Sequence, residues 1–249
     1  MQLLELLTIM MVVMVNYNLE KLIFIKRGAG KLSALKKWKS KQYLKDKFNN
    51  IEVYVEIYKS KKDMGISKSR TKQVNFNDYI DNLHENWYLP DCSLLSLDIN
   101  KDLYEDLVDP MRKEIPKDYR LFLGKNTRSG AHIHIEDDFV INQIVGKKIV
   151  YCLDFKELNL NHISNKRNNF SEENFFDLDK SKYKIQKFEL EPGDMLFIPP
   201  WIWHAVENVG ESIAVTKVFE REKSYFEKKG FEKLKQRHAH WLLWMLDTN

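Results

Sequence analysis

Short runs of apolar residues, many of them alternating with polar ones, dominate the chain from Tyr119 onward, and Gly, Pro, Asn or Asp residues separate them. Such runs predict strands with one face in a core. We predict eight of them: Leu121–Leu123, Ala131–Glu136, Phe139–Ile144, Lys148–Leu153, Tyr183–Leu190, Met195–Ile198, His204–Asn208 and Ser212–Phe219. Many short strands with turn signals are typical of a sandwich or barrel, so we expect a mainly β fold with flanking helices.

Helical spacing of apolar residues occurs before and after this region. Upstream it predicts helices over Lys31–Phe48 and Phe76–Trp87, with a strand at Ile51–Tyr58 and a polar loop at Lys59–Lys72 between them. Downstream it predicts a helix over Glu222–Leu246, rich in Trp, Phe and Leu. So many apolar side chains must be covered, either by the N-terminal half or by a second copy, which makes a homodimer through this helix one expectation.

These elements suggest three parts. We expect residues 1–118 to form a lead-in packed on a barrel, residues 119–220 to form the barrel, and residues 221–249 to form the C-terminal helix. The Asn-, Ser- and charge-rich stretch 156–182 is expected to be an insert over the barrel mouth. Candidate substrate contacts within it are His162, Arg167 and Asn168.

Composition agrees with a globular chain. Of 249 residues, 43% are hydrophobic and 31% charged. The cysteines, Cys92 and Cys152, lie far apart without metal-ligand spacing, which excludes a disulfide framework and suits a reducing, intracellular compartment, either cytoplasm or nucleus.

The N-terminus is apolar, but it does not indicate a membrane segment. The run Leu6–Val15 is too short to span a bilayer, and Gln2 to Glu5 lacks the positive charge of a secretory signal. We expect a helix or strand packed on the barrel and no membrane association, with a mis-assigned start codon as the alternative.

Basic residues are unevenly placed in a chain of net charge +4. Nine lie between Lys26 and Lys47 against one acid, and six between Lys59 and Lys72 against one acid. Such stretches suit an acidic partner or a phosphate backbone, and a solvated helix face and loop are the alternative. Aromatic residues are not interleaved with them, which disfavours single-strand binding.

The candidate chemistry lies in two segments. In the first, His134 and Glu136 are two apart, so on a strand both side chains share a face. In the second, the turn Pro199-Pro200-Trp201-Ile202-Trp203 presents His204 at the start of a strand. Two imidazoles and one carboxylate that leave coordination positions open are diagnostic of non-haem Fe(II) oxygenases. We therefore predict a metal site of His134, Glu136 and His204.

His132 shares the same strand face and is an alternative first ligand. The residue two positions on is then His134, and no carboxylate completes the pair. Three histidines, with or without Glu136, would resemble other metal cupins with different chemistry. In a third interpretation the histidines line a polar barrel interior that holds no metal.

The order of these motifs resembles that of JmjC-type, cupin-fold, 2-oxoglutarate-dependent oxygenases. The matching elements cover roughly residues 119–220, and a softer match extends over residues 32–107. They are His134-Ile-Glu136, Gly146-Lys-Lys148, Gly193-Asp194, Pro199, Trp201 or Trp203, His204 and the closing strand Ser212–Phe219.

The resemblance implies a double-stranded β-helix, also called a jelly roll, that uses Fe(II) with 2-oxoglutarate as cosubstrate. It assigns Lys148 to the distal carboxylate of 2-oxoglutarate, a role suited to a point charge. Its neighbour Lys147 would replace it if the strand slipped by one residue. Asn142 and Thr216 match further residues near the cosubstrate.

Some features depart from the family pattern. The residue three before the predicted metal ligand His134 is often Thr, which bonds the cosubstrate, but here it is Ala131. The carboxylate is Glu136 where Asp is commoner, and the gap from His134 to Lys148 is short. These departures put the second cosubstrate contact in question.

The resemblance implies an enzyme, and we expect hydroxylation of a side chain in a protein or peptide substrate. Demethylation of N-methyl-lysine and hydroxylation of a tRNA base are the alternatives within the same chemistry, the latter motivated by the basic segments. A non-catalytic cupin that serves as a binding module is the alternative from a different class. Fold alone does not decide between them.

Overall fold

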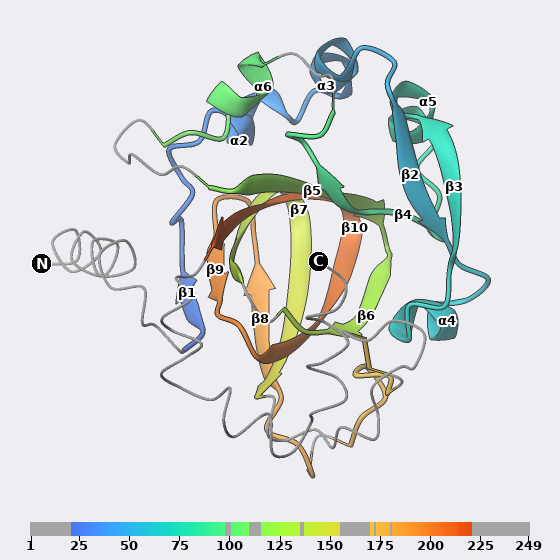
Figure 1. Ribbon diagram of the computed structural model, residues 1–249, viewed down its shortest axis with the longest axis vertical. Helices are drawn as coiled ribbons and strands as arrows, with labels where there is room; N and C mark the ends of the chain where they lie inside the picture. Colours follow the sequence, from blue (N-terminus) through green and yellow to red (C-terminus); the bar gives the residue numbers. More distant parts are fainter. Residues whose placement is uncertain are drawn as a thin grey trace, which may run out of the picture. The chain divides into compact units, whose positions relative to one another are not determined.

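Two long strands, β7 (Asp137–Asp154) and β10 (Ile202–Glu220), form the framework of the fold in the computed structural model (Figure 1). They pair with each other, and each also pairs with two further strands. The first half of β7 pairs with β9 (Met195–Ile198) and its second half with β8 (Gln186–Leu190). The first half of β10 pairs with β6 (Arg128–His132) and its second half with β5 (Asp118–Lys125).

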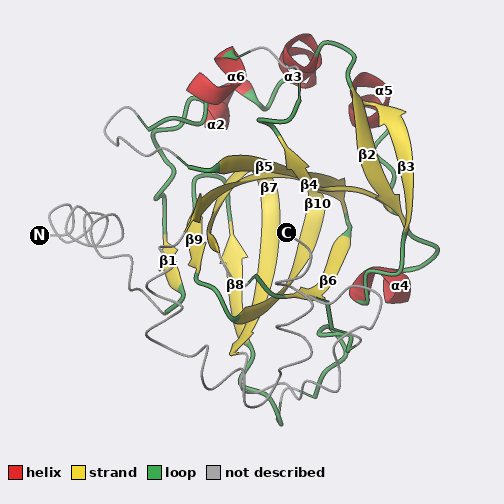
Figure 2. Cartoon of the chain, viewed as in Figure 1, coloured by secondary structure: helices red, strands yellow, loops and turns green. Residues whose placement is uncertain are grey.

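The two long strands therefore carry two sheets, one with β5 and β9 and the other with β6 and β8. This antiparallel arrangement is the double-stranded β-helix, and the predicted fold class is confirmed. Figure 2 shows that strands outnumber helices as the regular elements of the described chain.

The structure describes residues 21–97, 101–109, 116–134, 137–154, 170–171, 173–179 and 181–220. By its contacts the chain divides into a unit of Leu22–Phe219 and a unit made of the two ends, Met1–Lys21 with Glu220–Asn249. The predicted N-terminal segment, the predicted C-terminal helix and the candidate substrate contacts His162, Arg167 and Asn168 lie outside the described residues.

A glycine with positive φ marks the middle of each long strand. Gly146 has φ +68° in β7, and Gly210 has φ +67° in β10. A Cβ on Gly146 would lie 1.9 Å from the carbonyl oxygen of Glu211, whereas one on Gly210 would meet nothing within 4 Å. Both positions favour glycine by conformation, and Gly146 is required by space as well.

The predicted strands lie where the structure has strands, but the bounds of several of them are wrong. The pairs Phe139–Ile144 with Lys148–Leu153, and His204–Asn208 with Ser212–Phe219, are each one continuous strand. The glycines between them, which suggested turns, instead let a paired strand change direction. The predicted strand Ala131–Glu136 ends at His132.

The N-terminal part extends one sheet, whose order is β1-β9-β7-β10-β5-β4-β2-β3. The added strands are β1 (Ile23–Ile25), β2 (Glu52–Ile57), β3 (Arg70–Asn75) and β4 (Trp87–Ser93). The helices are α2 (Ala34–Lys37), α3 (Lys41–Phe48), α4 (Lys61–Gly65), α5 (Phe76–Asp81) and α6 (Asp102–Glu105). Helices α2, α3 and α6 lie on the outer side of the sheet that contains β5 (Figure 1).

Three of the predicted N-terminal elements need correction. The predicted helix Lys31–Phe48 is two helices, because Ser40 caps α3 by accepting a hydrogen bond of 3.2 Å from the Tyr43 N–H. The predicted loop Lys59–Lys72 contains α4 and the start of β3. The predicted helix Phe76–Trp87 ends at Asp81, and Trp87 begins β4.

A buried carboxylate joins the N-terminal helices. Asp106, just after α6, accepts hydrogen bonds from Ser33 Oγ, Lys37 Nζ, Trp38 Nε1 and Tyr43 Oη at 2.6–3.1 Å. Burial acts to raise the pKa of Asp106, but these donors outweigh it and hold the pKa below its usual value. The lead-in thus has a fixed internal structure.

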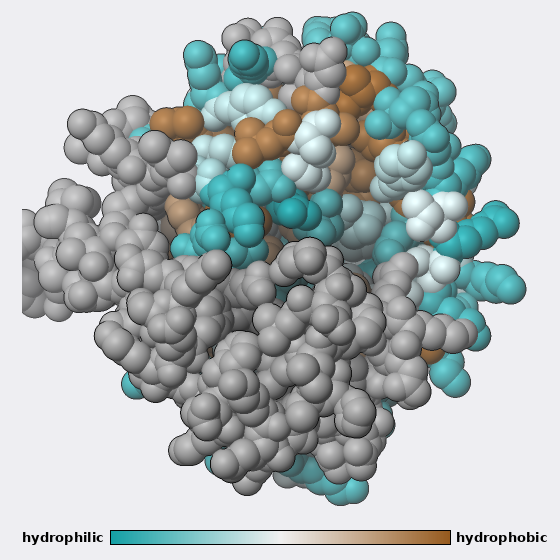
Figure 3. All heavy atoms as spheres, in the orientation of Figure 1, coloured by the Kyte–Doolittle hydropathy of each residue, from teal (hydrophilic) through white to brown (hydrophobic). Residues whose placement is uncertain are grey.

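The described surface is mixed in character. On the face seen in Figure 3, hydrophilic residues surround a smaller hydrophobic region. The most exposed large apolar side chains among the described residues lie apart from one another in the chain: Tyr54, Leu95, Val108 and Val209. None of the helices in the described ranges has the length and apolarity to cross a bilayer.

Candidate metal centre and adjoining pocket

His132 and His204 face each other across two paired strands. They are Cα partners in the register of β6 and β10, at the end of β6 and near the start of β10. Directly opposite residues of an antiparallel pair point to the same side of the sheet. Their ring centroids are accordingly only 4.1 Å apart.

Both rings are held by backbone carbonyls. Nδ1 of His132 donates to the Gly130 carbonyl at 3.0 Å, and Nδ1 of His204 donates to the Ile202 carbonyl at 3.1 Å. A carbonyl oxygen only accepts, so each Nδ1 carries the proton and each Nε2 keeps its lone pair. A hydrogen bond of this kind is what orients a histidine for metal binding.

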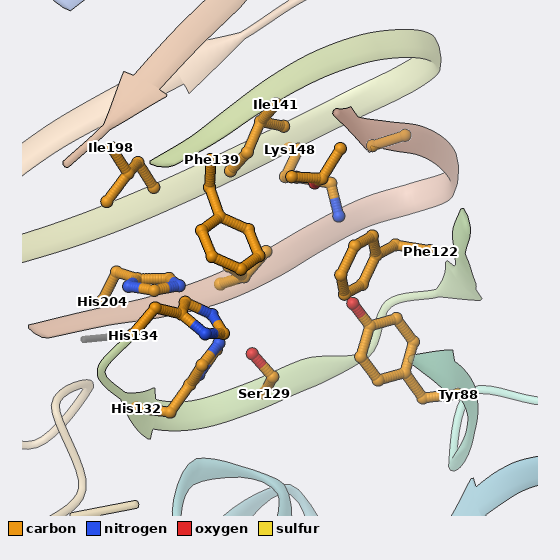
Figure 4. Close-up of a pocket in the computed structure, with 13 residues that line it drawn as sticks. Tyr88, Phe122, Ser129, His132, His134, Phe139, Ile141, Lys148, Ile198 and His204 are labelled. Carbon is orange, nitrogen blue, oxygen red and sulfur yellow. The ribbon is translucent and has the colours of Figure 1, made fainter. Parts of the chain in front are cut away.

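His134 completes a cluster of three imidazoles. It follows the end of β6, and its ring stacks on Phe139 with the centroids 3.8 Å apart. The potential ligand nitrogens of His132, His134 and His204 all lie within 4.8 Å of one another. Figure 4 shows the three rings grouped at one end of a pocket.

The three imidazoles favour the neutral form. Burial lowers the pKa of all three, and the pKa values of His134 and His204 lie well below the usual range. The neighbouring histidines lower the pKa of His134 and His204 further, because a second positive ring close by is unfavourable. A neutral imidazole is the form that binds a metal.

The predicted ligands are thus brought together in part. His134 and His204 lie in the cluster, whereas Glu136 lies outside the described residues. His132, the alternative first ligand, lies in the cluster as well.

The pocket beside the histidines is apolar with a few polar groups. Its walls come from Phe122, Phe139, Ile141, Ile198, Val206 and Ala214. The polar side chains that line it, besides the histidines, are Tyr88, Ser129, Lys148 and Thr216. An apolar cleft with a few convergent polar groups is typical of a small-molecule site.

Lys148 is the cationic residue of this pocket, and it is 2% exposed. Its Nζ donates to Asn208 Oδ1 at 2.8 Å and lies 5.8 Å from the centre of the Phe122 ring. Burial lowers the pKa of Lys148 to about 7. Among the described residues that line the pocket, no carboxylate balances it.

The structure places the other residues predicted near the cosubstrate in different positions. The register places Lys148 in the pocket, while Lys147 points to the opposite face and pairs with Glu189. Thr216 lines the pocket. The side-chain amide of Asn142 instead donates to the carbonyls of Val140 and Val215, and Asn142 is not among the lining residues.

Tyr88 and Ser129 are pocket residues that the sequence analysis missed. Ser129 lies three residues before His132, in the relation that Ala131 has to His134, so taking His132 as the first ligand would have pointed to it. Figure 4 shows its hydroxyl directed into the pocket. Tyr88 shares a hydrogen bond with Asn208, the partner of Lys148, but it comes from the lead-in strand β4, and no motif in the sequence marks it.

Helix α4 supports β6 from outside the pocket. Ser67, just after α4, accepts a hydrogen bond of 2.9 Å from the Gly130 N–H. A Cβ on Gly130 would lie 2.7 Å from Ser67 Oγ, so the close approach requires glycine. The residue whose carbonyl orients His132 is therefore anchored through its N–H by the lead-in.

A double-stranded β-helix with a pocket inside it is the architecture of a cupin, and the histidine cluster at one end of this pocket could hold a metal ion. The comparison with known families agrees: a family model described as cupin-like domain matches residues 23–225, and the chain belongs to this JmjC-like family of cupins.

The solved structures include a distant relative in fold. The X-ray structure of E. coli ycfD matches with a TM-score of 0.53 and 16% sequence identity, over 92% of this chain and 57% of that chain. At this identity the match bears on the fold alone. This chain spans little more than half of that relative's length, and no curated protein matches it.

Proposed function

We propose that the protein is an Fe(II)- and 2-oxoglutarate-dependent oxygenase that hydroxylates a protein side chain. The observation that carries the proposal is the placement of Lys148, buried at one end of a pocket whose other end holds the histidine cluster (Figure 4).

This arrangement favours a small anionic ligand with two binding ends. A buried ammonium is costly unless it is paired, and Asn208 offers it only a neutral acceptor. A carboxylate from a bound molecule would supply the missing negative charge. A metal ion at the histidines would hold the other end, as 2-oxoglutarate requires.

The pocket offers further polar partners for such a ligand. The hydroxyls of Ser129, Thr216 and Tyr88 line it and can hydrogen-bond a carboxylate. The apolar walls limit the access of water, which strengthens these interactions.

The histidine cluster fits iron. Imidazole nitrogens are suitable ligands for Fe, and two of the three rings have their Nε2 atoms freed by a backbone hydrogen bond at Nδ1. His134 and His204 are the proposed ligands, with a third side chain that the sequence predicts to be Glu136. Iron would couple the oxidative decarboxylation of 2-oxoglutarate by O2 to hydroxylation of a C–H bond, and the protein would hold cosubstrate and target.

The pairing of several basic residues with carboxylates supports a protein substrate over tRNA. The basic stretch between Lys26 and Lys47 forms α2 and α3, and several of its lysines are already paired with carboxylates. Lys37 pairs with Asp106 at 2.6 Å, Lys45 with Asp81 at 2.6 Å and Lys41 with Glu211 at 3.4 Å. These partners reduce the positive potential that a phosphate backbone would need.

The test is turnover of 2-oxoglutarate. The Fe(II)-loaded protein should convert 2-oxoglutarate to succinate and CO2, even slowly without substrate, and His134→Ala and His204→Ala should abolish it. Peptide pools and tRNA are then compared as stimulants, with hydroxylation expected on peptide. Absence of succinate under all conditions would support the binding-module alternative, and full turnover in both variants would refute the assignment.

A further inference from the structure

We infer that His132 is a ligand of the same metal ion, so that His132, His134 and His204 form a centre of three imidazoles. The inference deepens the proposed function, because it concerns the site that the oxygenase would use. It changes the donor set from two histidines and one carboxylate to three neutral nitrogens.

The strand register places His132 opposite His204 rather than opposite His134. The pairing of β6 with β10 matches His204 with His132, and β6 ends there. His132 is therefore held in a hydrogen-bonded ladder, whereas His134 lies beyond its end. Whatever ion His204 binds lies beside its cross-strand partner, whose ring centroid is 4.1 Å away.

The hydrogen bonds of the facing rings of His132 and His204 use Nδ1 and leave each Nε2 as an acceptor. Each donates its Nδ1 proton to a backbone carbonyl two residues earlier in the chain, Gly130 for His132 and Ile202 for His204. Within the described part of the chain, these are the hydrogen bonds shown for the two rings. The Nε2 lone pairs of both rings are partly enclosed in the histidine cluster. This is unfavourable unless a cation or a hydrogen-bond donor is shared between them.

The position of His132 is also supported from behind. Its ring stacks on Phe170 with centroids 5.1 Å apart, and the Gly130 peptide is held by Ser67 at 2.9 Å. These contacts restrain the ring and the backbone before it. A ligand placed by both its neighbours and its backbone needs little rearrangement to bind.

A three-imidazole centre has a different charge from the predicted one. Three neutral ligands leave a divalent ion with its full double charge, whereas a carboxylate would reduce the net charge by one. Imidazole donors suit Fe, Zn, Cu and Ni better than Mg or Ca, which prefer oxygen. The centre should therefore bind Co(II) and Fe(II), while Mg(II) should not compete.

The test uses metal alone. Co(II) titration of the metal-free full chain, followed by absorption spectroscopy, compares His132→Ala with His84→Ala, a histidine exposed outside the cluster. Loss of one ligand of a small set should weaken Co(II) binding by about 100-fold or more, while the His84 variant should stay within about threefold of wild type. Wild-type affinity in His132→Ala would overturn the inference.

A second measurement avoids any folding defect in the variants. Pulsed electron paramagnetic resonance of Cu(II) in the wild-type protein counts coupled imidazoles, and we expect three; a count of two would overturn the inference. Three imidazoles without succinate formation would contradict the proposed function alone. Succinate formation with two imidazoles and dependence on Glu136 would contradict this inference alone.

Discussion

The ammonium of Lys148 donates a 2.8 Å hydrogen bond to Oδ1 of Asn208, a neutral acceptor on the strand that also carries His204. The amide nitrogen of Asn208 in turn donates to Thr127 Oγ1 at 2.8 Å, so the side chain of Asn208 is locked with its oxygen toward the lysine. The protein thus orients a buried positive charge without neutralising it. Several consequences of this pair can be measured.

Replacing Lys148 by Met should weaken the binding of a 2-oxoglutarate analogue. A charge-assisted hydrogen bond contributes roughly 1.5–3 kcal/mol, so calorimetric titration with N-oxalylglycine should show a loss of about 10- to 150-fold. Lys147→Met is the matched control, because Lys147 pairs with Glu189 on the opposite face. Equal losses in the two variants would argue against the assigned role.

The same Lys148→Met change should stabilise the ligand-free protein. It removes a buried charge that has no carboxylate partner among the described lining residues and leaves an apolar side chain of similar length in the pocket. Urea denaturation at pH 6 should show a gain of about 1–4 kcal/mol in the free energy of unfolding. A loss of stability would mean that the ammonium contributes more to the fold than its visible contacts suggest.

Binding of the analogue should weaken as the pH rises above neutrality. Burial holds the pKa of Lys148 near 7 in the free protein, so the charged form that binds an anion declines above that value. With a higher pKa in the complex, the dissociation constant should rise up to about tenfold per pH unit above pH 7. Titrations from pH 6 to 8.5 test this, and Lys148→Met should remove most of the dependence.

The metal-free protein should lose stability in mild acid. Burial lowers the pKa values of His132, His134 and His204. The unfolded chain takes up protons near pH 6.5 while these rings resist them, so the free energy of unfolding falls as the pH drops through this value. Each ring that stays neutral contributes a loss of about 1.4 kcal/mol between pH 7.5 and 5.5.

Urea denaturation at these two pH values in the presence of a chelator measures that loss. The difference should shrink in His134→Gln and persist in His84→Gln, where the histidine lies outside the cluster. An unchanged difference in His134→Gln would show that other groups cause the acid sensitivity.

Gly146 and Gly210 should respond differently to alanine. Both need a positive φ, which costs a residue with a Cβ roughly 1–2 kcal/mol. Only at Gly146 would the Cβ also meet backbone, the Glu211 carbonyl at 1.9 Å. Denaturant unfolding should show a loss of about 1 kcal/mol for Gly210→Ala and well above 3 kcal/mol for Gly146→Ala, and equal losses would contradict the account of the folded strands.

The fold class and the approximate position of each barrel strand could be predicted from the sequence, because they depend on period-two apolar patterns and on turn residues. The continuity of β7 and β10 could not. A glycine between a valine and a charged residue, as at Gly146 and Gly210, has the same local pattern whether the chain turns or a paired strand bends, and only the neighbouring strands decide. Similarly, α4 lies in a polar stretch whose helix is stabilised by its Ser60 cap and tertiary contacts.

The candidate site could be predicted where one strand or one turn places a residue. Alternation within a strand places Lys147 and Lys148 on opposite faces, and the family resemblance selected Lys148 as the inward one. Periodicity specifies neither where β6 ends nor its register against β10. The sequence therefore could not show that His132, as well as His134, lies close to His204. Tyr88 reaches the pocket from a distant part of the sequence.

The contact between Ser67 and Gly130 bears on which stretch of sequence can work independently. A fragment cut at residue 116 would keep every predicted ligand, yet it would lose the hydroxyl that anchors the peptide before His132, and with it the β4 residue Tyr88. The lead-in is therefore part of the active architecture rather than an appendage. Exchanging the lead-in between relatives should change the affinity of the barrel for a metal ion, even though the lead-in supplies none of the proposed ligands.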